Sequence, residues 1–402
     1  MTSPAFSPQS RREFLRTLPA LALAARLAAA EQPEAGRDTS ASPSRHPERR
    51  EQYRDMIGTT LVHGQYFLTT KPNLIEGAEK MLELGTRVGK FWFEPGRAAR
   101  DNAWNSDWPA MKTLRDLAAS PYWQTVFRLP FTTLMLNAHS PGERGWNAEQ
   151  PPEFYAHITA EWEELVHYLY ATHGDRPLTI ILQNWEGDWQ LRGTGVLWDT
   201  PPPDWQVRCT RYARRLAARQ EGVNRARAAA PAGSVLRVVH AVEVNRVADA
   251  WKGIPTLTEH VLPLVEVDLV SYSCYDAMQD GPTLVRAIET IRRFARTGAL
   301  FGPGAVYLGE IGIPENVHPE RITERWDELL GAALAARVLY ISQWQLYCNE
   351  PDPRTAPHPA PPITDPQHLR GFWLIRPDGS LSESGRYFQS LWQPQNKPSL
   401  PP

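Results

Sequence analysis

The sequence contains little cysteine and almost no net charge. Its 402 residues carry a formal net charge of −2, which argues against nucleic acid as the main partner, because proteins that bind nucleic acids usually display a clustered basic surface. The three cysteines, Cys209, Cys274 and Cys348, lack the spacing of a metal-binding motif, and their odd number leaves at least one thiol unpaired. We therefore expect buried free thiols rather than a disulfide framework.

A membrane-spanning run and a glycine-rich phosphate loop are also missing. The apolar run near the N-terminus, "TLPALALAARLAAA", is shorter than the roughly 20 residues that a membrane span needs, and Arg26 interrupts it. No cysteine follows this run, so we expect neither a lipid anchor nor another stable membrane anchor. No glycine-rich fingerprint follows the first predicted strand, which disfavours a dinucleotide-binding fold.

The N-terminus is typical of an export signal. "SRREFLR" (residues 10–16) places twin arginines before a hydrophobic pair, and small residues end the apolar run that follows. This pattern resembles the twin-arginine (Tat) signal, with Arg16 where the motif has Lys. The resemblance implies a signal peptide over residues 1–30, recognition by the Tat export machinery, and a periplasmic or extracellular protein. Residues 31–50, rich in Pro, Ser, Glu and Arg, are expected to form a disordered linker.

From residue 56 onward, short β-rich apolar runs alternate with longer helical patterns, as in "PNLIEGAEKMLELG". The predicted strands lie in 56–64, 87–93, the later half of 126–139, 176–189, 234–245, 267–276, 305–315 and 338–350. The predicted helices lie in 72–85, 109–119, 151–174, 204–230, 256–265, 283–297 and 322–337, and a hairpin around residues 377–379 precedes a closing helix.

Strict alternation of strands and helices indicates an α/β protein with a parallel sheet covered by helices. Eight such units in residues 51–395 fit a single (β/α)8 TIM barrel better than an open doubly wound sheet. In such a barrel the working residues lie at the carboxyl ends of the strands and in the loops that follow.

Two glutamates stand at predicted strand ends. Glu310 follows Val306 and Leu308 at alternate positions, and this parity predicts that it points into the barrel. A lone carboxylate there is costly unless partners or a catalytic role explain it. A pair of carboxylates facing one another could act as a proton donor and a nucleophile on a sugar.

Glu186 is the second candidate, in "LQNWEGDW". It shares parity with Leu182 and Asn184, so it too is predicted to face the interior. Asp188 is its nearest rival as the acid, and Glu243 of "HAVEVN" is the next.

These residues carry a family resemblance. A glutamate ending the fourth strand, "GEIG" ending the seventh, a tyrosine closing the sixth and a tryptophan closing the eighth resemble the clan of retaining β-glycosidases on (β/α)8 barrels, which includes cellulases and β-mannanases. The resemblance covers residues 56–392. It implies that Glu186 is the general acid/base, that Glu310 is the nucleophile, that Tyr275 bonds to the nucleophile, and that Trp344 lies under the sugar.

The sequence departs from the clan pattern at three positions. Trp185 separates Asn184, the residue expected to hold a sugar hydroxyl, from Glu186. Lys90 stands on the second strand, where many relatives have an arginine, and it cannot offer the planar fork of Arg. The sixth strand has Ser273 where His is common.

Tryptophan is abundant, with 15 residues. Many fall at predicted strand ends or in the following loops, where indole rings suit sugar faces. These are Trp92, Trp104, Trp108, Trp146, Trp185, Trp189, Trp198, Trp251 and Trp344. Of these, Trp92, Trp189 and Trp344 are predicted to bind substrate.

Two other classes remain open. A non-catalytic carbohydrate-binding barrel would keep the aromatic residues without needing paired carboxylates. A metal-dependent hydrolase barrel would use His63, His139 and His240, but no His-x-His motif lies on the first strand, and His139 is predicted to line a sugar pocket instead. We predict an exported glycoside hydrolase that acts on an oligo- or polysaccharide without metal or cofactor.

Overall fold

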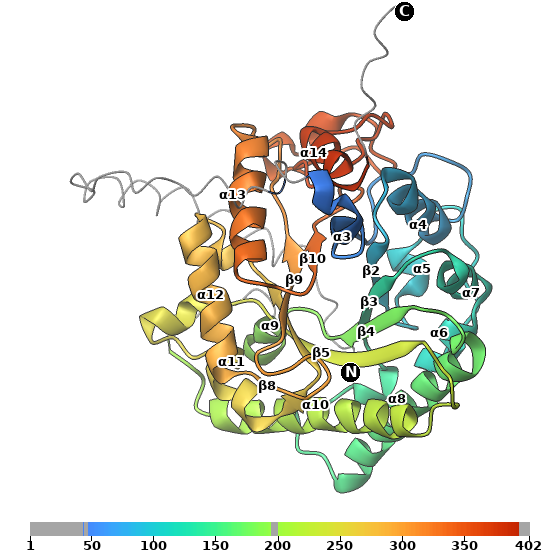
Figure 1. The fold of residues 1–402 in the computed structure, drawn as a ribbon, viewed down its shortest axis with the longest axis vertical. Helices are drawn as coiled ribbons and strands as arrows, with labels where there is room; N and C mark the ends of the chain where they lie inside the picture. The colour runs from blue at the N-terminus through green and yellow to red at the C-terminus, as the bar shows by residue number, and fades with distance from the viewer. Residues whose placement is uncertain (1–42, 44–46, 194–199, 394–402) are drawn as a thin grey trace, which may run out of the picture.

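The computed structural model describes residue 43 and residues 47–193 and 200–393 (Figure 1). The predicted signal peptide and most of the predicted linker lie outside the described residues. The last residues of that linker form a 3-10 turn, η4 (Pro47–Arg49), and the start of a short helix, α3 (Arg50–Arg54).

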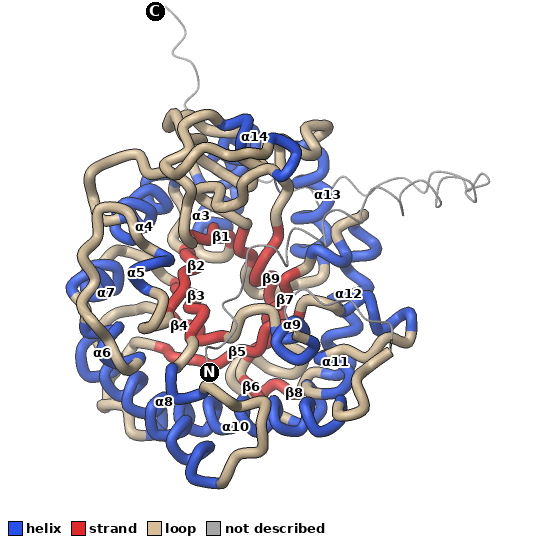
Figure 2. The backbone as a smooth tube through the Cα atoms, turned by 180° about the vertical axis from the view of Figure 1, so that it is seen from behind, coloured by secondary structure: helices blue, strands red, loops and turns tan. Residues whose placement is uncertain are grey.

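Eight parallel strands close into a barrel, in the order β1-β10-β9-β7-β5-β4-β3-β2. They are β1 (Ile57–Leu61), β2 (Val88–Phe93), β3 (Thr133–Ala138), β4 (Thr179–Gln183), β5 (Arg237–Val244), β7 (Leu269–Ser273), β9 (Val306–Ile311) and β10 (Ile341–Gln343). Figure 2 shows the strands as a ring enclosed by helices. The predicted (β/α)8 TIM barrel is confirmed.

The helices cover the outside of this ring. The main ones are α4 (Asn73–Leu84), α8 (Pro152–His173), α10 (Trp205–Ala228), α12 (Gly281–Phe294), α13 (Ile322–Ala335) and α14 (Glu383–Trp392). Shorter ones are α5 (Ala98–Asp101), α6 (Leu114–Ala119), α7 (Pro121–Arg128), α9 (Gly187–Arg192) and α11 (Leu257–His260). The 3-10 segments are η5 (Pro141–Glu143), η6 (Val247–Lys252), η7 (Leu262–Leu264), η8 (Tyr275–Ala277), η9 (Pro353–Thr355) and η10 (Pro366–His368).

Several segments differ from the sequence-based prediction. Helix α7 (Pro121–Arg128) was not expected, and it forms because the Ser120 side chain accepts the Trp123 N–H and Pro121 opens a new helix. The fourth strand stops at Gln183, and α9 takes up the "GDW" that was expected to continue it. A small parallel pair, β6 (Glu266–Val267) and β8 (Arg296–Thr297), was not expected.

The barrel strands are buried on both faces, and this sets two separate cores. The smaller core fills the barrel and takes residues from six strands, among them Ile181 and Tyr307. The larger core lies between strands and helices and includes Leu182, Val306 and Leu308. The side-chain parity predicted for β4 and β9 is therefore wrong, because a strand buried on both faces carries no polar alternation to show which face is inside.

The predicted hairpin near the C-terminus is confirmed. Ile375 bridges Leu381 in antiparallel fashion, and the Arg376 N–H donates to the Ser380 carbonyl. The three cysteines are free and buried, as expected. Within the described part of the chain, no helix combines the length and apolar character needed to cross a membrane.

Candidate active site

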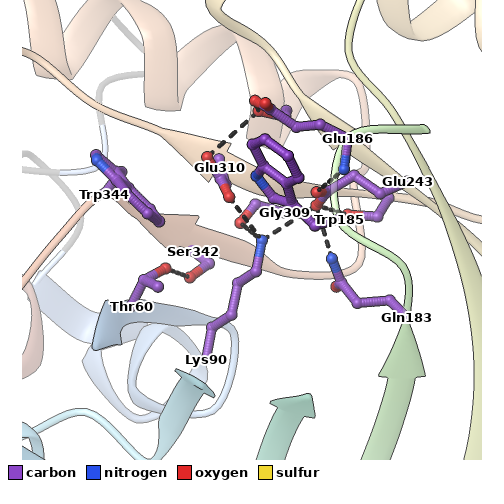
Figure 3. Close-up of polar contacts among 12 residues, drawn as sticks. Thr60, Lys90, Gln183, Trp185, Glu186, Glu243, Gly309, Glu310, Ser342 and Trp344 are labelled. Carbon is purple, nitrogen blue, oxygen red and sulfur yellow. Dashed lines mark hydrogen bonds and ion pairs between the residues drawn. The ribbon is translucent and has the colours of Figure 1, made fainter. Parts of the chain in front are cut away.

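A layer of polar residues lies inside the barrel above the apolar core, toward the carboxyl ends of the strands (Figure 3). Lys90 comes from β2, Gln183 from β4, Glu243 from β5 and Ser271 from β7, and all four side chains are buried. The last three bond across strands: Gln183 Nε2 and Ser271 Oγ each donate to Glu243 Oε2 at 2.7 Å. In a TIM barrel this end of the strands carries the chemistry.

Lys90 divides its ammonium among three acceptors. Its Nζ lies 3.1 Å from Glu243 Oε2, 3.2 Å from Glu310 Oε1 and 3.0 Å from the Gly309 carbonyl. An ammonium has three N–H donors, so these acceptors match all of them. The two carboxylates are ion-paired through one cation.

Glu310 reaches the barrel interior through a β-bulge. Tyr272 of β7 pairs with Leu308, but the next residue, Ser273, pairs with Glu310, so Gly309 is an extra residue in β9. An inserted residue shifts the side chains that follow it to the opposite face. The bulge therefore turns Glu310 inward although it shares parity with the outward-facing Leu308.

Glu186 enters the site from the segment that joins β4 to α9. Its backbone is left-handed, with φ of 30°, which is uncommon for a residue other than Gly. Its N–H donates to Glu243 Oε1 at 3.0 Å. A buried anion that accepts this N–H helps to hold the unusual backbone, and the side chain is buried.

Ser273 joins the two candidate catalytic carboxylates. Its hydroxyl lies 2.8 Å from Glu186 Oε1 and 3.4 Å from Glu310 Oε2. Two glutamates separated by more than a hundred positions in the chain therefore approach one hydroxyl. Together with Lys90 and Glu243, they form what we call the barrel cluster: Lys90, Glu186, Glu243 and Glu310.

Asp188, the rival acid, lies elsewhere. Its Oδ2 accepts the N–H groups of Asn245 and Arg246, and its Oδ1 accepts the N–H of Leu257 at 2.8 Å. Three backbone donors tie this carboxylate to the segments after β5. Asp188 fixes loops and is not aimed at the other carboxylates.

Asn184 bonds to the main chain of Glu243. Its Nδ2 donates to the Glu243 carbonyl at 3.2 Å, and its Oδ1 accepts the Glu243 N–H at 3.1 Å. This pair extends the β4–β5 ladder by one side chain. The predicted contact of Asn184 with a sugar hydroxyl stays a prediction.

Two tryptophans lie beside the barrel cluster. Trp92 at the end of β2 packs edge-on against Trp344, with ring centroids 5.8 Å apart, and Lys90 Nζ lies 5.9 Å from the Trp92 ring. The Trp344 indole N–H donates to Glu350 Oε1 at 3.2 Å, and Glu350 in turn pairs with Arg370. The hydrogen bond to Glu350 therefore fixes the orientation of the Trp344 ring.

The other predicted aromatic residues are placed as follows. Trp189 in α9 lies under the Arg246 guanidinium, 5.6 Å from its ring centroid. Tyr275 opens η8 and packs edge-on against Phe372. Trp104 and Trp108 donate their indole N–H groups to main-chain carbonyls of nearby loops, and Trp198 lies outside the described residues.

His139 follows β3 and accepts the Trp185 N–H at its Nε2, 3.4 Å away. Burial, together with the charges of Arg219 and Arg215, lowers the pKa of His139 well below its usual 6.5. A neutral imidazole suits the acceptor role. His139 therefore contacts the backbone beside Glu186.

A second set of buried charges, which the sequence-based reasoning missed, lies between α8 and α10. Glu143 accepts hydrogen bonds from Arg215, Arg219 and the Trp162 indole. Burial alone would raise the pKa of Glu143, but the two guanidinium groups outweigh it and bring the pKa to about 2. We call Glu143, Arg215 and Arg219 the helix cluster.

Gln190 connects the two clusters. Arg215 donates to its Oε1 at 2.8 Å, and its Nε2 donates to the Trp185 carbonyl. The residue before Glu186 is therefore held by Gln190 on one side and His139 on the other.

Two further carboxyl groups near the strand ends have raised pKa values. Burial raises the pKa of Glu94, directly after β2, to about 7 against the charge of Arg97. Burial also raises the pKa of Asp276 to about 6, although Arg246 and the Tyr272 hydroxyl oppose it.

No protein-family model matches the sequence, and no curated protein matches it. Among solved structures, the chain is similar to GH5_18 from Streptomyces cattleya in complex with Manβ1-4GlcNAc, at 15% identity and a TM-score of 0.49, over 82% of this chain and 77% of that chain. It is also similar to an exo-β-1,4-mannosidase from Opitutaceae bacterium strain TAV5, at 13% identity and a TM-score of 0.49, over 84% of this chain and 59% of that chain. A β-glycosidase matches at 15% identity and 0.49, over 87% and 98%.

The described residues contain no set of side chains arranged as metal ligands. Among them, no group of three or more His, Cys, Asp and Glu side chains is placed to hold a metal ion. His240, one of the three histidines considered for such a site, bonds through Nδ1 to Gln220 behind β5.

Proposed function

We propose that this chain is a glycoside hydrolase that cleaves a β-linked glycan with retention at the anomeric carbon. One observation carries the proposal: a single Ser273 hydroxyl reaches oxygens of both Glu186 and Glu310, at 2.8 and 3.4 Å. The two oxygens are thus no more than about 6.2 Å apart, whereas carboxyl separations are about 5–5.5 Å in retaining enzymes and roughly 6.5–9.5 Å in inverting ones. This limit, which applies to one oxygen of each carboxylate, admits the spacing of a retaining enzyme, and we propose retention on that ground.

The surroundings favour different roles for the two glutamates. Lys90 bonds to Glu310, and an adjacent cation favours an ionised carboxylate. Glu310 is therefore the nucleophile. Glu186 is buried beside that negative charge, and both burial and a like charge favour its protonated form.

In the first step, a Glu310 oxygen bonds to the anomeric carbon while Glu186 gives its proton to the departing glycosidic oxygen. In the second step, Glu186 takes a proton from water, the water oxygen bonds to the anomeric carbon, and the bond to Glu310 breaks. Lys90 neutralises the carboxylate that is released. Trp344 and Trp92 are buried rings packed against each other beside the cluster, and they form the apolar side of the proposed sugar site.

We also propose that the protein is exported through the Tat pathway to the periplasm or the cell exterior, on the twin-arginine pattern of residues 10–16. Fusing residues 1–50 to a reporter that is active only after export tests this. Replacing both arginines with lysine should abolish reporter export.

The function is tested by incubating the purified protein with a panel of β-linked polysaccharides and aryl β-glycosides. The anomeric configuration of the first product is then read by NMR. We expect hydrolysis with a β-configured first product. Glu310→Gln should lower kcat by at least about 10⁴-fold without changing the melting temperature by more than a few degrees, because it removes the nucleophile.

Full activity in Glu310→Gln would refute the assignment. An α-configured first product would refute retention. Sugar binding without turnover, unchanged by Glu186→Gln, would instead identify a carbohydrate-binding barrel.

A further inference from the structure

Glu243 contacts Glu186 directly and is linked to Glu310 through Lys90. Its Oε1 accepts the Glu186 N–H at 3.0 Å. Its Oε2 accepts Lys90 Nζ at 3.1 Å, and Lys90 also donates to Glu310. The side chain is fully buried, and no role is assigned to it by the two-glutamate mechanism.

The Glu243 carboxylate is held firmly in this place. Gln183 and Ser271 each donate to Oε2 at 2.7 Å, and the Glu243 main chain pairs with the Asn184 amide. Gly309 makes room for it, since a Cβ at that position would meet Glu243 Oε2 and Ser271 Oγ. A buried carboxylate with four side-chain or main-chain donors is built into the strand layer rather than left by chance.

We propose that Glu243 is a positioning residue that holds the backbone of Glu186 with one oxygen and shares Lys90 with Glu310 through the other. It thereby sets both the placement of the acid/base and the ionisation of the two catalytic glutamates. This inference rests on the proposed function. It assigns to the barrel cluster a third carboxylate that does not touch substrate.

Other titratable groups face the barrel cluster from neighbouring strands. Tyr307 of β9 lies near Glu243, and Cys274 after β7 lies near Glu310. His139 after β3 approaches through the Trp185 N–H and is neutral. Burial raises the pKa values of Tyr307 and Cys274 well above their usual range, so neither group changes its charge between pH 4 and 9. The cation that Glu243 and Glu310 share is Lys90.

The sign of the effect follows from charge. A negative charge nearby makes a carboxyl group harder to ionise, so removing that of Glu243 lowers the pKa values of both Glu186 and Glu310. Removing the positive charge of Lys90 raises them. The two limbs of the pH profile of kcat/KM report these groups in the free enzyme.

The experiment compares pH profiles of the full-length enzyme and three variants on an aryl β-glycoside. Glu243→Gln should move both limbs to lower pH by about one unit, and it should lower kcat about tenfold because the Glu186 N–H loses an anionic acceptor. Lys90→Met should move both limbs to higher pH. The double variant should return the limbs toward those of the wild type while kcat stays low.

Glu315→Gln is the matched control. Glu315 is also buried and accepts a backbone N–H, that of Ser384, at 2.6 Å, but it lies against α14. Glu315→Gln should lower the melting temperature and leave both limbs of the pH profile where they are in the wild type. A loss of kcat in Glu243→Gln without a shift of the limbs would overturn the proposal, and so would wild-type behaviour.

Two measurements keep the test decisive. If Glu243→Gln does not fold, unshifted limbs in Lys90→Met overturn the proposal. Titration of ¹³C-labelled glutamate carboxyl groups by NMR, assigned through Glu186→Gln and Glu310→Gln, follows the same pKa changes without turnover. A wild-type protein without hydrolase activity would therefore overturn the proposed function while the coupling among the three carboxylates is still measured.

Discussion

The protein buries two clusters of charged side chains, one with more cations than carboxylates and one with more carboxylates than cations. The helix cluster sets two guanidinium groups around Glu143. The barrel cluster instead gathers three carboxylates and one cation: Lys90 pairs with Glu243 and Glu310, and Glu243 accepts the backbone N–H of Glu186. In the first, the excess of positive charge keeps the carboxylate ionised, with a pKa of about 2. In the second, an excess of carboxylates in a buried place favours retention of a proton. Burial of charge is common to both, but only the second arrangement suits proton transfer.

The largest expected effect is loss of activity on removing a carboxylate from the barrel cluster. Glu186→Gln should lower kcat by about 10²–10⁴-fold on glycosides with poor leaving groups, and less on activated aryl glycosides, which need little protonation. The free energy of unfolding should be unchanged or slightly higher, because a like charge is removed. Kinetics on a leaving-group series, together with urea unfolding, checks both. Equal losses on all leaving groups would contradict the acid role.

Removing the carboxylate of the helix cluster should instead lower stability and leave activity largely intact. Glu143→Gln leaves Arg215 and Arg219 without their carboxylate, and it should lower the free energy of unfolding by about 3–5 kcal/mol. Activity per folded molecule should be largely retained at low temperature. Urea unfolding and active-site titration at 15 °C would measure the two separately.

Acid should weaken the helix cluster in the wild type. Because the pKa of Glu143 falls from 4.5 to about 2 on folding, its ionised form contributes about 3 kcal/mol of stability above pH 4.5, and this is lost as the pH falls toward 2. Unfolding curves between pH 5 and 2 should show a steeper loss in the wild type than in Glu143→Gln. Parallel curves would contradict the depressed pKa.

A smaller effect is expected from filling the space beside Glu243. Gly309→Ala places a methyl group against Ser271 and the Glu243 carboxylate, and overpacking of this kind costs about 1–3 kcal/mol. The displaced carboxylate should also shift the pH profile, which a purely steric change elsewhere would not. Calorimetry and the pH dependence of kcat/KM measure these.

The smallest effect is expected at the residue between the clusters. Gln190→Leu removes the bonds to Arg215 and to the Trp185 carbonyl, so we expect about 1 kcal/mol of destabilisation and a severalfold lower kcat. If kcat is unchanged, the two clusters act independently.

The fold was predictable because each strand and helix carries a strong local pattern. The barrel followed from the alternation of "VYLGEIG"-like runs with long amphipathic segments. Helix α9 was missed because its six residues are too few to show a helical period. Helix α7, which directly follows the helix predicted at 109–119, depends on the Ser120 cap, whose hydrogen bond is not visible in a hydrophobic pattern.

For the candidate site, the sequence indicated which residues come together better than it indicated how they reach the barrel interior. Glu186 and Glu310 were predicted to point inward by parity, yet Leu182 and Leu308 face the helices. The glutamates reach the interior through a left-handed residue and a bulge. Glu243 was considered only as a rival acid. A stronger signal was present: Lys90 and Glu243 are charges within strands that are predicted to be buried, and buried charges need partners.

The bond from Lys90 to the Gly309 carbonyl differs in kind from its bonds to the two carboxylates. As one of three acceptors for Lys90, it belongs to the main chain, so no side-chain substitution can delete it. A descendant that exchanges Glu310 for another residue would keep the ammonium anchored to Gly309 and Glu243. Replacing Glu310 therefore removes one of the three acceptors of Lys90 and leaves the other two in place.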